Sequence, residues 1–238
     1  MHPTTGAAGA ARTHEDHPLD ELVAVMDRLR SPGGCPWDAE QTHESLAKHT
    51  LEEAYELVET LETADRAGMR EELGDLLLQV VFNARVAQEH EEEPFGLADV
   101  ARDLTAKLVR RHPHVFADEE YVDDDALTAR WDAIKREEKA RTSCLEGVPL
   151  AQGALSRAQK VVSRAARAGL LPGAADELRD GAVPADVDEE AAVGAALLAL
   201  VRRAQAIGVD AEGALRAASR AVEAQVRAAE ETRRSGAG

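Results

Sequence analysis

The stretch "EELGDLLLQVVFNARVAQEH", residues 71–90, decides the fold of this chain. At about 100° per residue, it forms a helix with one wide apolar face. The residues on that face are Leu73, Leu76, Leu77, Val80, Val81, Ala84 and Ala87. Three more apolar residues, Leu78, Phe82 and Val86, lie well outside it. A helix that is apolar on most sides is buried by its neighbours, so the pattern predicts a helix packed inside a bundle.

One narrow polar strip runs along this helix. It consists of Glu72, Asp75, Gln79 and Asn83. Glu72 and Asp75 are three positions apart, so their side chains point the same way about one turn apart. A carboxylate held beside a buried helix is costly unless it is paired or bound to a cation. The strip therefore provides the first candidate metal ligands.

A second acidic group precedes this helix. Glu52, Glu53 and Glu56 fall in a helix expected from about residue 42 to residue 61, and Glu53 and Glu56 repeat the spacing of three. The connector is short, which predicts that the two helices are antiparallel neighbours. Two such acidic pairs can surround a hard cation such as Mg²⁺ with oxygen ligands. The same acids also fit an ordinary solvated face, because they lie away from the apolar stripe of Leu51, Ala54, Val58 and Leu61.

The rest of the chain also shows helical periodicity. Further helices are expected at residues 19–30, 97–112, 123–141, 150–169, 191–208 and 211–234. The composition of residues 1–17 is that of a disordered tail, and residues 170–190 have the composition of a linker. No segment shows sustained alternation of β-branched residues, so the sequence predicts an all-α protein.

The second half of the chain contains a weakened copy of the opening stretch. Residues 191–210 align with it and share its glycine and leucine pattern. Ala192 and Ala195 stand where the opening stretch has its two acids. This indicates a decayed duplication, in which the second copy keeps its packing and has lost its charges.

Composition narrows the class of partner. The 238 residues contain 45 Asp and Glu against 28 Lys and Arg, a formal net charge of -17. Such a surface repels nucleic-acid polymers and anionic membranes, but a carboxylate-bound cation can still hold a small phosphorylated ligand. No apolar run reaches the ~18 residues of a membrane span, and no secretory start or disulfide framework is evident. We therefore expect a cytoplasmic protein.

Five motifs occur in order over residues 19–141, the region that also contains all seven aromatic residues. They are "GGCPWDAEQTHESL" (33–46), "LEEAYEL" (51–57), "EELGDLLLQVVF" (71–82), "KLVRRHPHVF" (107–116) and "RWDAIKREEK" (130–139). Together they resemble the MazG family of nucleoside triphosphate pyrophosphohydrolases. The resemblance implies a helical bundle of the MazG type, assembled as a dimer, that converts a nucleoside triphosphate and water into a nucleoside monophosphate and diphosphate.

The family's metal pattern is Glu-Glu-x-x-Glu followed by Glu-x-x-Asp. By resemblance, the ligands of Mg²⁺, or of Mn²⁺ in its place, are Glu53, Glu56, Glu72 and Asp75. The resemblance also makes Glu52 and Glu53 the catalytic residues, with Glu52 helping to orient a water molecule.

The family's nucleotide-contacting positions map onto Lys107, Arg111, Trp131 and Lys135. The first two are one helical turn apart and would contact phosphate oxygens. Trp131 would stack on the base, with Lys135 on the same helix face. Trp131 equally suits a core or dimer anchor, and the two lysines equally suit solvated helix charges.

These inferences give one overall interpretation. A catalytic domain at residues 18–141 follows the tail 1–17 and precedes a degenerate helical domain at residues 150–231 that lacks the acidic motif; residues 232–238 are a frayed tail. The protein is expected to be a Mg²⁺-dependent homodimer that clears non-standard or surplus nucleoside triphosphates. Two alternatives stay open: a related phosphoribosyl-ATP or dUTP-type pyrophosphohydrolase, and a non-catalytic interaction or regulatory module.

Overall fold

The computed structural model describes residues 18–117, 130–131, 134, 142–171 and 188–236. Regular structure in these residues is helical, and none of them lies in a β-strand, so the all-α prediction is confirmed. The chain divides into two compact units, Met1–Asp124 and Asp125–Gly238. The expected tail at 1–17, most of the expected linker and most of the expected helix at 123–141 lie outside the described residues.

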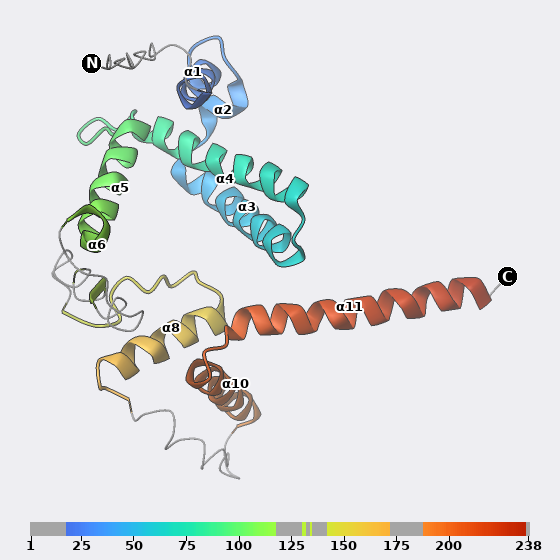
Figure 1. Ribbon diagram of the computed structural model, residues 1–238. Helices are drawn as coiled ribbons and strands as arrows, with labels where there is room; N and C mark the ends of the chain where they lie inside the picture. Colours follow the sequence, from blue (N-terminus) through green and yellow to red (C-terminus); the bar gives the residue numbers. More distant parts are fainter. Residues whose placement is uncertain (1–17, 118–129, 132–133, 135–141, 172–187, 237–238) are drawn as a thin grey trace, which may run out of the picture. The chain divides into compact units, whose positions relative to one another are not determined.

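The first unit is built around an antiparallel pair of long helices (Figure 1). Its helices are α1 (Pro18–Arg30), α2 (Pro36–Glu40), α3 (His43–Thr63), α4 (Arg66–Ala87), α5 (Leu97–Arg111) and α6 (Pro113–Phe116). α3 and α4 lie side by side along most of their length. The predicted antiparallel arrangement is therefore confirmed.

Local sequence explains how this helical pair begins and turns. Thr42 caps α3, because its hydroxyl accepts from the Ser45 N–H at 3.2 Å while the Ser45 hydroxyl accepts from the Thr42 N–H at 3.0 Å. Ala64 ends α3 in the left-handed conformation, with φ at 56°. Asp65 then caps α4, and its carboxylate accepts from two backbone N–H groups at 3.1 Å. Two residues are thus enough to reverse the chain.

The core of the first unit lies between α1, α3 and α4. Met26, Leu46, Val81 and Phe82 form its buried cluster. The partly buried residues packed against the cluster are Leu22, Val23, Leu29, Leu77, Leu78, Val86 and Leu97. Burying a side chain of this size contributes about 1.5–3 kcal/mol, so this cluster is a main source of stability in the unit.

The burial of α4 differs from the prediction at several positions. Leu73 is 52% exposed and Val80 is 43% exposed, although both belong to the apolar face that was expected to be buried. Phe82 lies outside that face, yet it is only 3% exposed because it joins the cluster with α1 and α3. Periodicity identifies the apolar residues of a helix but not the side from which its neighbours approach.

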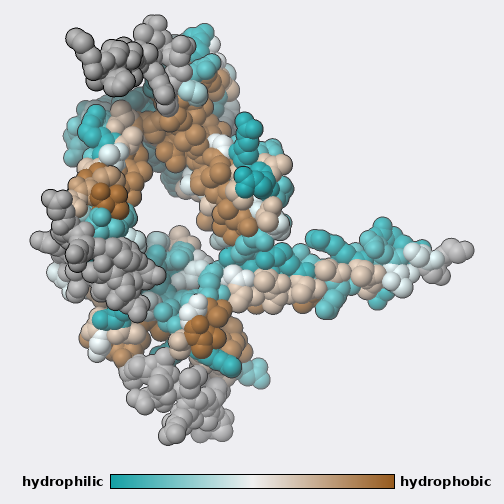
Figure 2. All heavy atoms as spheres, in the orientation of Figure 1, coloured by the Kyte–Doolittle hydropathy of each residue, from teal (hydrophilic) through white to brown (hydrophobic). Residues whose placement is uncertain are grey.

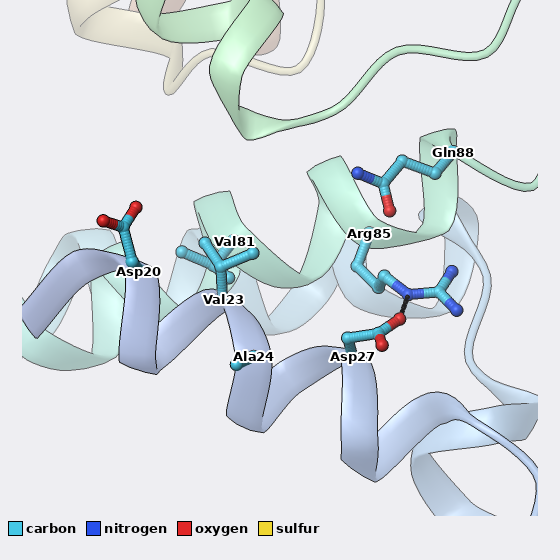
Figure 3. Close-up of a pocket in the computed structure, with 7 residues that line it drawn as sticks. All are labelled: Asp20, Val23, Ala24, Asp27, Val81, Arg85 and Gln88. Carbon is cyan, nitrogen blue, oxygen red and sulfur yellow. Dashed lines mark hydrogen bonds and ion pairs between the residues drawn. The ribbon is translucent and has the colours of Figure 1, made fainter. Parts of the chain in front are cut away.

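Ion pairs join α1 to the end of α4. The Arg30 guanidinium donates to both carboxylate oxygens of Glu89, at 2.8 and 2.9 Å. Arg85 donates to Asp27 at 2.8 Å and to Glu89 at 2.9 Å. The Arg85–Asp27 pair borders a shallow groove of about 440 Å³ between the two helices (Figure 3). These bonds hold the first helix against the helical pair.

The second unit contains α8 (Ala154–Arg167), α10 (Glu189–Ala206) and α11 (Ala211–Gly236). The Glu212 carboxylate accepts from the backbone N–H and the hydroxyl of Ser156, both at 3.2 Å, and Gln159 donates to the Val209 carbonyl at 2.7 Å. Polar contacts thus join α8 to the start of α11. Among the described residues, no single helix is long and apolar enough to cross a membrane, although α10 and α11, bent by 111°, pass by length and composition as a pair.

Candidate functional site

α3 and α4 bring three carboxylates together. One oxygen from each of Glu53, Glu56 and Glu72 lies within 4.8 Å of the other two. Among the described residues, these three form the single such group of acidic, histidine or cysteine side chains. The two sets of acids, separate in the sequence, meet because the two-residue turn folds α4 back along α3. Three of the four expected metal ligands therefore converge.

The fourth expected ligand, Asp75, lies one turn along α4 from Glu72. Its charge helps to raise the pKa of Glu53 and of Glu72 above the usual carboxyl range. Burial is the largest cause of both shifts, and the remaining causes are the neighbouring acids. For Glu53 these include a hydrogen bond with the Glu56 carboxyl. The site is thus a partly desolvated set of mutually repelling carboxylates.

One oxygen of the site has no hydrogen-bond partner. Oε2 of Glu72 is buried and accepts no hydrogen bond. A buried acceptor without a donor is unfavourable, and a bound cation removes that deficit. Carboxylate oxygens are also the ligands that hard divalent cations prefer. The residues present therefore fit a hard divalent cation, which would satisfy Glu72 and relieve the repulsion.

Glu52 lies outside the convergent group. Its carboxylate is 62% exposed and lies 3.1 Å from Nδ1 of His49, one turn earlier on α3. The His49 ring meets the edge of Trp37, with 6.4 Å between ring centroids, and Trp37 also packs edge-on against Phe82 at 6.5 Å. Glu52 and its neighbours thus belong to an aromatic surface beside the carboxylates.

The expected nucleotide-contacting residues are only partly described. Lys107 and Arg111 are half-buried on α5, one turn apart, and α5 packs against α4. Trp131 is a half-buried helical residue of the second unit, and Lys135 lies outside the described residues. On α10, the positions corresponding to the acids of α4 carry Ala192 and Ala195, as the alignment indicates.

Sequence reasoning missed the α3 residues that contact Gln79 and Asn83, the two positions of the polar strip that follow Asp75. Asn83 Oδ1 lies 2.8 Å from His43 Nδ1, and Gln79 Oε1 lies 3.5 Å from the Thr50 hydroxyl. The strip itself was visible, because its spacing continues past Asp75. Nothing in the sequence of α3 distinguishes His43 and Thr50 from other polar residues, so their contacts required the structure.

The fold and the site define an all-helical protein with a carboxylate site for a divalent cation. Comparison with known proteins adds that the model of the MazG nucleotide pyrophosphohydrolase domain matches residues 41–116. The chain is 41% identical over 230 residues to the nucleoside triphosphate pyrophosphohydrolase of Escherichia coli. This match covers 89% of the present chain and 87% of the Escherichia coli protein. The chain belongs to the MazG family.

Two further relatives support the assignment. An uncharacterized 26.1 kDa protein in the blaB 3' region of Streptomyces cacaoi is 48% identical over 213 residues, covering 89% of this chain and 82% of that protein. The nucleoside triphosphate pyrophosphohydrolase of Mycobacterium tuberculosis is 46% identical over 189 residues. This match covers 78% of the present chain but 56% of the mycobacterial protein, which is therefore considerably longer than the shared part.

Proposed function

We propose that this protein hydrolyses nucleoside triphosphates to nucleoside monophosphates and diphosphate with the help of a divalent cation. The observation that carries the proposal is the convergence of carboxylate oxygens from Glu53, Glu56 and Glu72, together with the buried and unpartnered Oε2 of Glu72. The printed names of the relatives from Escherichia coli and Mycobacterium tuberculosis support the reaction. The bond between the α and β phosphates breaks, and one water molecule is added across it.

We propose that the cation is Mg²⁺, with Mn²⁺ able to replace it. Four carboxylates would hold it, those of Glu53, Glu56, Glu72 and Asp75. When bound, such a cation polarises phosphate oxygens and lowers the pKa of a water molecule. Glu52 follows His49 by three positions and precedes Glu53 directly. We assign Glu52 the role of orienting the attacking water, because its carboxylate is exposed at the edge of the site.

Cationic and aromatic side chains would bind the rest of the substrate. Lys107 and Arg111 on α5 would neutralise phosphate oxygens, Arg111 through its two-pronged guanidinium. Trp131 would stack on the base, and we propose Lys135 as a further substrate-binding residue. A substrate held by contacts to phosphates and to an aromatic face suits a broad range of bases, as clearance of surplus or non-standard triphosphates from the cytoplasmic nucleotide pool requires.

The exposed apolar face of the first unit supports assembly as a homodimer. Leu51 and Tyr55 on α3, with Leu73 and Val80 on α4, are 43–53% exposed. Figure 2 shows apolar side chains gathered over these two helices. Monomeric proteins rarely leave contiguous apolar patches open, and a second copy of the helical pair would cover this one. We propose that residues 18–141 carry the chemistry and that residues 150–231 stabilise the assembly.

The decisive experiment is product analysis. The purified chain is incubated with Mg²⁺ and each nucleoside triphosphate in turn, and the products are separated. Monophosphate and diphosphate are expected. Nucleoside diphosphate with inorganic phosphate would contradict the proposal, because a different bond would have broken. Absence of turnover with every triphosphate would favour a non-catalytic module.

A further inference from the structure

We propose that two polar contacts, His43–Asn83 and Thr50–Gln79, position the carboxylates of the cation site by fixing how α3 and α4 pack. We refer to these four residues as the polar clamp. None of them belongs to the convergent acids, so they would act through those acids rather than on the substrate. The inference rests on the proposed function, because it concerns the same cation site.

The first contact of the clamp has a defined direction. Asn83 Oδ1 lies 2.8 Å from His43 Nδ1. A carbonyl oxygen only accepts hydrogen bonds, so Nδ1 of His43 carries the proton that it donates. The Asn83 amide nitrogen donates to the backbone carbonyl of Gln79 at 2.8 Å. This second bond holds the amide so that its oxygen points toward α3.

The second contact lies deeper between the helices. Gln79 is the single buried polar residue among those described, with 6% of its surface exposed. The Thr50 hydroxyl donates to the Leu46 carbonyl within α3 at 3.1 Å and shares the same proton with Gln79 Oε1 at 3.5 Å. A buried amide is unfavourable without a partner, so Gln79 favours the helix arrangement that places Thr50 opposite it. An apolar side chain would accept several arrangements.

The clamp and the acids belong to one interface. Gln79 follows Asp75 by four positions on α4, and Thr50 precedes Glu53 by three on α3, so each pair lies on one side of its helix. The turn at Ala64 fixes the opposite end of the helical pair. The carboxylates therefore lie between two fixed points.

Removal of the clamp would leave the helical pair held by its turn and by apolar packing, in which Leu46 of α3 shares the buried cluster with Val81 and Phe82 of α4. Side-chain atoms lie about 5–6 Å from the helix axis, so a rotation of about 20° moves them by about 2 Å. Mg²⁺ demands near-ideal geometry, with oxygens at about 2.0–2.1 Å from the ion, so displacements of that size disrupt a shared site. We therefore expect the clamp to govern cation affinity more than folding.

The test uses the full chain and Mn²⁺ as the probe, with binding followed by electron paramagnetic resonance. The double variant His43→Leu with Thr50→Val removes both donors from α3. Its dissociation constant for Mn²⁺ is expected to rise about tenfold or more, while its helical circular dichroism stays that of the wild type. Its melting temperature in chelator should fall only modestly, by the loss of the partner of the buried Gln79 amide. Turnover should recover toward the wild-type value at saturating Mn²⁺, which a general loss of structure would prevent.

A matched control and a rescue separate the clamp from nonspecific effects. Thr60→Val removes another hydroxyl of α3, which donates to the Leu57 carbonyl within the same helix at 2.9 Å, and this variant should bind Mn²⁺ like the wild type. His43→Gln keeps an N–H donor and is expected to retain most of the affinity. If the double variant loses its helical circular dichroism, Gln79→Met takes its place, with the same expectation.

Two results would overturn the inference. Wild-type Mn²⁺ affinity in the clamp variants would show that the acids are positioned without it. An equal loss of affinity in Thr60→Val would show a nonspecific effect of α3. These failures differ from failure of the proposed function, in which the wild-type chain itself would neither bind Mn²⁺ nor release diphosphate.

Discussion

Glu53 on α3 and Glu72 on α4 place carboxylate oxygens within 4.8 Å of each other. Burial and the charges of the neighbouring acids raise the pKa of both groups above the usual range. Repulsion of this kind opposes folding when the acids are ionised and favours cation binding. Activity and stability are therefore expected to respond in opposite directions when one of these acids is neutralised.

Glu72→Gln tests this opposition directly. The substitution removes a cation ligand and one of the repelling charges, so turnover should fall by more than about 100-fold. The melting temperature in chelator should rise, because the amide carries no charge. Glu59→Gln, a surface change on α3, is the control and should alter neither quantity. A variant with normal turnover would remove Glu72 from the site.

The raised pKa values of Glu53 and Glu72 should make the stability of the protein depend on pH. Between the usual carboxyl pKa and the raised value, the folded chain holds more protons than the unfolded chain, so the contribution of Glu53 and Glu72 to stability falls as pH rises through that window. Other acids titrate in the same range, so the informative quantity is the difference in unfolding free energy between the wild type and Glu72→Gln. That difference should grow in chelator as pH rises from the usual carboxyl pKa through the raised pKa values. Saturating Mn²⁺ should reverse its sign, and a constant difference would contradict the assignment.

The ion pairs that join α1 to the end of α4 predict the opposite dependence of stability on pH. Hydrogen bonds and charge from Arg30, with a further contribution from Arg85, hold the pKa of Glu89 below its usual range. Its stabilising effect is therefore present above the usual carboxyl pKa and is lost as pH falls through the lowered pKa. Glu89→Gln should lower stability by about 1 kcal/mol at neutral pH, a modest value because the carboxylate is 44% exposed. Chemical denaturation measures the loss, and Glu91→Gln should be neutral by comparison.

The proposed dimer is tested by a charge on its apolar face. Leu73→Glu combined with Val80→Glu should convert a dimer into a monomer, because two carboxylates per copy would lose water at the interface. Light scattering after size-exclusion chromatography measures the mass. Val25→Glu, at an exposed position of α1, is the control. A wild-type chain that stays monomeric at every concentration would refute this interface.

Predictability differed between the two long helices. Spacing on α4 identified the polar strip, and the structure places that strip against α3 through Gln79 and Asn83. On α3 the apolar stripe suggested the packed face, yet Leu51 is 50% exposed and Leu61 is 53% exposed, while Glu53 is half-buried in the acidic group. An apolar stripe on a helix predicts that another protein surface covers it. That surface can belong to a second copy of the protein as well as to the same chain.

The sequence by itself determined the helical class, the short turn that pairs the two acidic helices and the identity of the candidate ligands. Each of these depends on local spacing, which a linear pattern records. The tertiary structure decided that Glu53, Glu56 and Glu72 converge, that Glu52 lies outside their group, and that His43 and Thr50 face the polar strip. These outcomes depend on the rotation of each helix about its axis, and only the packing of α3 against α4 fixes that rotation.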